Sequence, residues 1–188
     1  RKVNMEITIK KGNHLSNQLS YPRFNWFDNG QLVVEVTFDS DSRYYLEDKS
    51  EQLDWNKLFG ASWGFFPPIQ SYMMHENSSR FGWRYNVKTS KYEVTPYYYS
   101  NGVRKYAEVI GIEPAILNEG DTYKFIIRPV KGNGIDLVYY TIEDKFGKEI
   151  FSYKALQNVP TLSGWLAPGY FEETKPTNKR VIYLFKKL

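Results

Sequence analysis

Hydrophobic and polar residues alternate along most of the chain, with the period of β-strands that bury one face. The alternation predicts strands at residues 3–10, 31–38, 79–87, 91–99, 103–110, 122–130, 135–143, 149–154 and 179–187. Residues 58–66 read LFGASWGFF, are apolar on both faces and stop at Pro67-Pro68, which indicates a central strand. One or two helical turns are expected at residues 51–57.

Turn signals separate these strands and suggest their pairing. Residues 88–90 connect two expected strands as a short hairpin, and Ser100-Asn101-Gly102 turns the chain into a third, which gives a three-stranded meander. Pro129 near the end of its strand indicates a strand terminus or an edge, because proline cannot donate to the ladder.

The number and spacing of the strands define the fold class. Roughly ten to twelve strands at intervals of about 8–12 residues are typical of a sandwich or a barrel. The expected strand lengths do not match well enough for closure, so two stacked antiparallel sheets of the jelly-roll kind are favoured. We therefore expect an all-β protein whose 188 residues form one domain, 1–188.

Aromatic residues make up 18% of the chain, with 16 Tyr, 12 Phe and 5 Trp. Most should fill the core of the sheets, and a few exposed rings could stack on sugar faces. Cysteine is absent, so the chain has no disulfide and no thiolate metal ligand. No cofactor is expected.

Charge and hydropathy limit the possible partners. The net charge of +4 is spread along the chain, so there is no strong nucleic-acid signature. No apolar run is long enough for a transmembrane segment. No signal peptide is visible at the basic start of the sequence, which fits a virion-associated, cytoplasmic or exported and cleaved protein. The sequence sets no oligomeric state.

Residues 75–86, HENSSRFGWRYN, combine a polar cluster with an aromatic strand. In a strand, Phe81, Trp83 and Tyr85 share one face, which we predict to be core, with Trp83 buried. Arg80, Gly82, Arg84 and Asn86 share the other face, where Gly82 could leave room for a ligand to approach the backbone.

The expected ligand-binding residues follow from this face and its neighbouring strand. Asn77, Arg80 and Arg84 would supply hydrogen bonds, and an exposed Tyr97 or Tyr98 would supply a stacking ring. The alternative is that the two arginines pair with carboxylates such as Glu93 across the hairpin.

Catalytic and metal-binding chemistry have weak support. His14 and His75 are isolated, and no nucleophile motif surrounds the serines near His75. Asp39 and Asp41 have the spacing of paired carboxylates but sit in the turn sequence FDSDSR, which is more typical of a solvated turn than of a calcium loop or a glycosidase pair. We predict no catalytic residue and no metal site.

Three segments resemble a group of uncharacterised β-sandwich proteins of Bacteroidetes-type bacteria and their phages. They are LFGASWGFFP, then HENSSRFGWRYN with KYEVTPYYYSNGVR, and APGYFEETKPTNKRVIYLF. Asn77, Ser78, Arg80, Phe81, Gly82 and Trp83 match the second motif of that group, and Tyr170 and Phe171 match the third. Glu172-Glu173 stands where the group has glycines. The resemblance implies a concanavalin-like double-sheet fold.

These observations favour a non-catalytic β-sandwich binding module for carbohydrate. The alternative is a structural or assembly protein, such as a phage virion or cell-surface component with a protein partner. A glycan-cleaving enzyme ranks third. Aromatic residues gathered on one sheet would favour a glycan, and a broad flat apolar patch would favour assembly.

Overall fold

The computed structural model describes residues 4–9, 23–25, 31–46, 48–64, 74–134, 136–161, 163–167 and 181–186. Its strands are β1 (Asn4–Ile9), β2 (Arg23–Asn25), β3 (Leu32–Thr37), β4 (Asn56–Trp63), β5 (Ser78–Asn86), β6 (Lys91–Ser100), β7 (Val103–Lys105), β8 (Ala115–Leu117), β9 (Thr122–Val130), β10 (Leu137–Glu143), β11 (Glu149–Leu156), β12 (Ser163–Ala167) and β13 (Val181–Lys186). A 3-10 turn, η1 (Ser40–Ser42), and a short helix, α1 (Ala107–Ile110), complete the elements.

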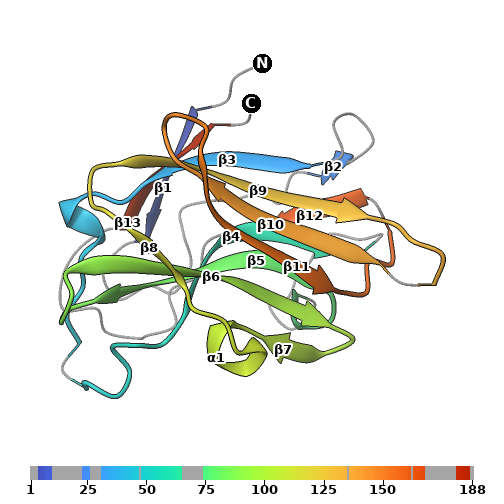
Figure 1. Cartoon of the computed structure of the whole chain (residues 1–188), viewed down its shortest axis with the longest axis horizontal. Coiled ribbons are helices and arrows are strands. Elements are labelled where there is room, and N and C mark those ends of the chain that lie inside the picture. Colours follow the sequence, from blue (N-terminus) through green and yellow to red (C-terminus); the bar gives the residue numbers. More distant parts are fainter. Residues whose placement is uncertain are drawn as a thin grey trace.

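The strands form a two-sheet antiparallel sandwich, which confirms the predicted all-β class (Figure 1). One sheet has the order β11-β10-β9-β3, and β13, paired with β1, lies beside β3. The other sheet has the order β2-β12-β4-β5-β6-β7, and β8 also pairs with β6. We call these the four-stranded and the seven-stranded sheet.

Alternating side chains from both sheets fill the space between them. Phe81 and Trp83 of β5 are fully buried, as are Phe125 of β9 and Tyr140 of β10. The Phe81 ring meets Phe125 and Tyr140 edge-on, with centroids 4.9 and 5.5 Å apart. The prediction that Trp83 belongs to the core is therefore confirmed.

Strands with long alternation match the prediction to within a few residues. The apolar stretch at residues 58–66 includes most of β4, which lies between β12 and β5, so the central-strand prediction is confirmed. Pro129 is near the end of β9, beyond the last residue that pairs with β3, so its missing N–H leaves no gap on that side. The strands β2, β8 and β12 were not predicted, because three to five residues are too few for a clear alternation.

Two predicted elements are wrong. Residues 103–110 were expected to be one strand, but β7 ends at Lys105 and α1 follows. The helix ends because Gly111, at φ 71°, turns its N–H back to the Ala107 carbonyl at 2.8 Å. Residues 51–57 were expected to be helical, but they form a turn and the start of β4, whose Asn56 is opposite Trp83 in the ladder.

Candidate functional site

The outer face of the seven-stranded sheet carries the polar side chains of the predicted site. On β5, Ser78, Arg80, Gly82 and Arg84 alternate with the core residues and therefore point outward. The ladder places Arg80 opposite Tyr97 of β6, on the same outer face. Side chains from two adjacent strands thus form cross-strand rows on this face.

Two glycines make room for side chains that lie flat across the sheet. A Cβ atom on Gly82 would be 3.2 Å from both Cβ and Cδ2 of Tyr97. A Cβ atom on Gly60 would be 2.8 Å from Cγ of Arg80 and 2.0 Å from the Ser79 carbonyl oxygen. The expectation that Gly82 leaves a gap for a ligand is therefore wrong, because Tyr97 fills it.

The predicted stacking residues Tyr97 and Tyr98 are both buried, with 2% and 5% of their surface exposed. Tyr98 points into the main core between the sheets, as the strand alternation requires. Tyr97 points outward but packs against Trp55 and against Ala107 of α1, which cover the sheet at this place. The expectation of an exposed ring at either position is wrong.

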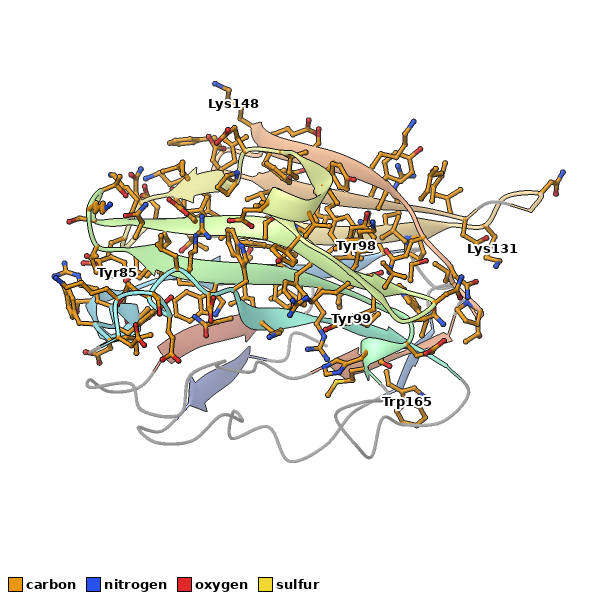
Figure 2. All side chains as sticks on the ribbon, turned by 90° about the horizontal axis from the view of Figure 1, so that it is seen from below. Tyr85, Tyr98, Tyr99, Lys131, Lys148 and Trp165 are labelled. Atoms are coloured by element: carbon orange, nitrogen blue, oxygen red, sulfur yellow. The ribbon has the colours of Figure 1, made fainter. Side chains whose placement is uncertain are left out.

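A series of aromatic rings runs from the segment before β5 to Tyr106, which lies between β7 and α1. Figure 2 views the molecule with this side toward the reader and labels Tyr99. His75 stacks on Tyr99 with ring centroids 4.8 Å apart, Tyr99 meets Tyr97 at 6.1 Å, and Tyr97 stacks with Tyr106 at 6.0 Å. We call these four residues the ring row. His75 is exposed, and Tyr99 and Tyr106 are partly exposed, so the row is accessible at both ends.

Cationic groups border the ring row. The Arg104 guanidinium lies 5.2 Å from the centre of the Tyr106 ring, and Lys57 Nζ lies 5.0 Å from the centre of the Tyr97 ring. Burial and the neighbouring Tyr99 hydroxyl raise the pKa of Tyr97 above its ordinary value, and the opposing effect of Arg104 is smaller. The Tyr97 hydroxyl is therefore protonated at neutral pH, where it can donate a hydrogen bond and cannot serve as a base.

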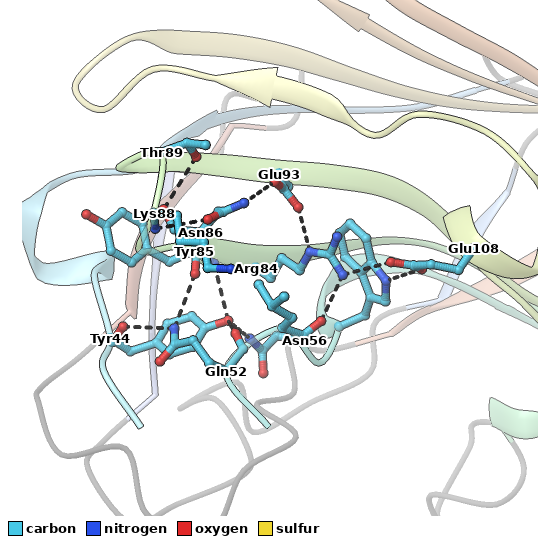
Figure 3. Close-up of polar contacts among 12 residues, drawn as sticks. Tyr44, Gln52, Asn56, Arg84, Tyr85, Asn86, Lys88, Thr89, Glu93 and Glu108 are labelled. Carbon is cyan, nitrogen blue, oxygen red and sulfur yellow. Dashed lines mark hydrogen bonds and ion pairs between the residues drawn. The ribbon is translucent and has the colours of Figure 1, made fainter. Parts of the chain in front are cut away.

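Arg84 is held by internal partners at the other end of the face (Figure 3). Its Nε donates to Glu93 at 2.6 Å, and its Nη1 donates to Glu108 and to the Leu53 carbonyl at 2.8 and 2.9 Å. The guanidinium lies 4.0 Å from the centre of the Trp55 ring, whose indole N–H donates to Glu108 at 2.7 Å. The alternative pairing of Arg84 with Glu93 is therefore present.

We call Arg84, Glu93, Glu108 and Trp55 the Arg84 clasp. Although burial alone would raise it, hydrogen bonds from Trp55 and Arg84 hold the pKa of Glu108 below its ordinary value. The clasp joins α1 and the turn before β4 to the middle of the sheet, which gives it a structural role.

Asn77 and Arg80 also have internal partners. Asn77 is 6% exposed, and its side-chain oxygen accepts a hydrogen bond from the Asn101 backbone N–H at 2.9 Å. This contact joins the segment before β5 to the turn between β6 and β7. Arg80 is 4% exposed, and its Nη2 contacts the sulfur of Met74. A role of Asn77, Arg80, Arg84, Tyr97 and Tyr98 in ligand binding stays a prediction.

Sequence reasoning missed several residues of this face. Arg104 and Tyr106 lie two residues apart beside the meander, so the period-two rule could have placed them on one face next to Tyr97. The contribution of Glu108 had no such signal, because it depends on α1 folding back over β6 (Figure 1).

The described residues contain no group of three or more His, Cys, Asp or Glu side chains that could hold a metal ion. Asp39 caps η1 by accepting a hydrogen bond from the Asp41 backbone N–H at 2.9 Å. The Asp39 carboxylate is therefore hydrogen-bonded within its own turn. His14 and the motif residues Tyr170, Phe171, Glu172 and Glu173 lie outside the described residues.

Within the part of the chain that the structure describes, no helix is long and apolar enough to cross a membrane. Comparison of the chain with protein-family models, with curated proteins and with solved structures finds no match.

Proposed function

We propose that this chain is a non-catalytic binding module for carbohydrate and that the sugar binds along the ring row. The supporting observation is the row itself, four aromatic rings in successive contact on the outer face of one sheet. Flat apolar rings stack on the C–H faces of sugars, and neighbouring polar groups bind the sugar hydroxyls.

The exposed parts of the row suit this role. His75 and Tyr99 form a stacked pair at one end, and Arg104 lies over Tyr106 at the other. Between these ends, the buried Tyr97 supports both neighbours and keeps their rings in place. A preorganised platform of this kind loses little conformational entropy when a ligand binds.

A glycan-cleaving activity has less support. A glycosidase needs two carboxyl groups about 5–9.5 Å apart across the scissile bond, one of them with a raised pKa. On this face Glu93 and Glu108 are bound to Arg84, and the pKa of Glu108 is lowered by the hydrogen bonds from Trp55 and Arg84 that outweigh its burial.

The assembly alternative rests on exposed apolar residues of the four-stranded sheet. Leu156 is 67% exposed and lies opposite Leu137, which lies opposite Val130. The next cross-strand row contains Arg128 and Lys154, so charged residues border this apolar patch on one side. A small bordered patch supports assembly less than a broad flat one would.

Glycan-array binding of the purified chain, followed by variants of the row, tests the proposal. Tyr99→Ala and His75→Ala should each lower the affinity for a bound glycan, because each removes one ring of the exposed pair. Tyr139→Ala is the matched control, because Tyr139 carries Arg128 at 4.6 Å on the outer face of the other sheet.

Circular dichroism of each variant shows whether the fold is kept. A wild type that binds no glycan at millimolar concentration would remove the proposal, and sedimentation analysis would then test for assembly. Release of new reducing ends from a bound glycan would instead favour the enzymatic alternative.

A further inference from the structure

Three cationic side chains surround the ring row. Lys57 and Arg104 lie over Tyr97 and Tyr106, and Arg80 is opposite Tyr97 in the β5–β6 ladder. They come from three different strands, so the sheet itself brings them together. Arg104 is exposed, whereas Lys57 and Arg80 are buried, with 5% and 4% of their surface accessible.

Two of the described carboxylates near this face are bound to Arg84. Glu93 accepts hydrogen bonds from Arg84 and Asn86, and Glu108 accepts from Arg84 and from the Trp55 indole. Glu76, next to His75, is exposed and approaches the turn at Gly102. Arg84 thus neutralises Glu93 and Glu108, and Arg104 lies over Tyr106 at the accessible end of the row.

Hydrogen-bond donors for an anion also gather here. The Tyr99 and Tyr97 hydroxyls interact with each other, and the Tyr97 hydroxyl interacts with the Arg104 guanidinium. In the ladder, Arg104 is directly opposite Tyr99. A planar guanidinium beside phenolic hydroxyls presents several donors to one carboxylate or sulfate group, and such charge-assisted hydrogen bonds are among the strongest in proteins.

We infer that the ligand of the ring row is an acidic glycan, whose sugars carry carboxylate or sulfate groups. Arg104 binds the anionic group, and Tyr99 and Tyr106 contact the sugar rings on either side of it. This inference rests on the proposed function and narrows its class of ligand.

Affinity electrophoresis with matched pairs of polymers tests the inference. Polygalacturonate and its methyl ester differ in the charge of the carboxylate, and dextran sulfate and dextran differ in the sulfate group. A single-stranded oligonucleotide serves as an anion without a pyranose ring. We expect an acidic polymer to retard the chain at least about tenfold more strongly than its neutral partner, with the difference shrinking from 50 to 200 mM salt.

Two arginine variants separate the site from general surface charge. Arg104→Gln should lower the affinity for the acidic polymer about three- to tenfold and leave binding to the neutral partner unchanged. Arg128→Gln removes the equivalent arginine, which lies over Tyr139 on the other sheet. This variant should keep the wild-type affinity for both the acidic polymer and its neutral partner.

The outcomes distinguish the inference from the proposed function. Equal binding of the neutral and acidic polymers, an equal loss in Arg104→Gln and Arg128→Gln, or equal retention by the oligonucleotide would each overturn the acidic-glycan inference. Glycan-array binding confined to neutral sugars would overturn it and leave the proposed function standing. Binding to no glycan of either kind would overturn both.

Discussion

Trp83 marks the core face of β5, opposite the outer face that carries Arg84. It is fully buried and packs against Phe38, Tyr44 and Tyr92, with ring centroids 5.3 to 6.3 Å away. Trp83→Ala should lower the free energy of unfolding by about 3–5 kcal/mol, because the lost rings leave a cavity among aromatic neighbours that cannot collapse fully. Urea unfolding followed by circular dichroism measures the change.

The partly exposed Tyr139 provides the comparison for this variant. Tyr139→Ala should change the free energy of unfolding by less than about 1 kcal/mol, because the residue is partly exposed on the outer face, where it lies beside Arg128. If Trp83→Ala kept wild-type stability and lost glycan binding alone, Trp83 would belong to the ligand site and the division of faces would be wrong.

Gly60 and Gly82 differ in what an added methyl group would meet. At Gly82 the new Cβ would be 3.2 Å from the Tyr97 side chain, which can shift, so Gly82→Ala should cost about 1–3 kcal/mol. At Gly60 the new Cβ would be 2.0 Å from a backbone oxygen, which the ladder holds, so Gly60→Ala should cost more. Urea midpoints of the two variants would contradict this order if Gly82→Ala were the less stable.

At the scale of the element, α1 depends on contacts with the sheet more than on its own helical turns. It has four residues, too few to be stable alone, and its Ala107 packs against Tyr97 and Trp55. Glu108→Ala removes the acceptor of the Trp55 indole and one partner of Arg84. We expect it to lower the free energy of unfolding by about 1–2 kcal/mol.

A double-mutant cycle isolates the clasp from other effects. Arg84→Ala combined with Glu108→Ala should cost less than the sum of the two single changes, because each single change removes the same ion pair. Glu108→Gln keeps an acceptor for the Trp55 indole, so it should lower the free energy of unfolding by about half as much as Glu108→Ala. Additive losses would show that Arg84 and Glu108 act independently.

The predicted and observed elements differ where the alternation of apolar and polar residues does not match buried and exposed positions. From Thr122 to Val130 every second residue is buried, so the pattern and the strand agree. Between Val103 and Ile110, by contrast, the apolar residues Val103 and Val109 are 53% and 48% exposed. These two side chains do not pack in the core, so their spacing does not require a strand. Gly111, whose positive φ closes a helical turn, ends a short helix here instead.

The candidate site was predictable only as far as the hairpin register. Residues 88–90 fix that register, and it places Arg84 opposite Glu93, so their pairing followed from the sequence. The burial of Tyr97 did not follow, because its cover comes from Trp55 and α1, which neither the strand period nor the turn signals locate. Contacts between a sheet and the segments that cover its outer face are tertiary features, and the period-two pattern of a strand does not predict them.

At the scale of the whole molecule, one buried amide joins the two sheets. Gln157, directly after β11, donates to the Ser78 carbonyl of β5 at 2.7 Å and accepts from the Tyr140 hydroxyl of β10 at 3.0 Å. Because buried amides are costly to leave unpaired, this bridge fixes how β5 sits over the four-stranded sheet. The start of β5, where Ser78 lies opposite Tyr99 of the ring row, is thus held by both layers.

Buried tyrosines should make the whole sandwich sensitive to alkali. Burial raises the pKa of Tyr44, Tyr92, Tyr97, Tyr98 and Tyr140 well above the ordinary value near 10. The folded state therefore keeps these hydroxyls protonated at a pH where the unfolded chain ionises. Their contribution to stability is full below about pH 10 and is lost as the pH rises above that value.

Absorbance of tyrosinate measured against pH tests this expectation. In about 8 M urea all 16 tyrosines should titrate gradually around pH 10, as in an unfolded chain. In native buffer the exposed fraction should titrate first, and the buried tyrosines should ionise together in a steep step that coincides with loss of the circular dichroism signal. A single gradual titration in native buffer, with the fold intact, would show that the interior of the sandwich admits hydroxide and that these rings are less buried than the structure places them.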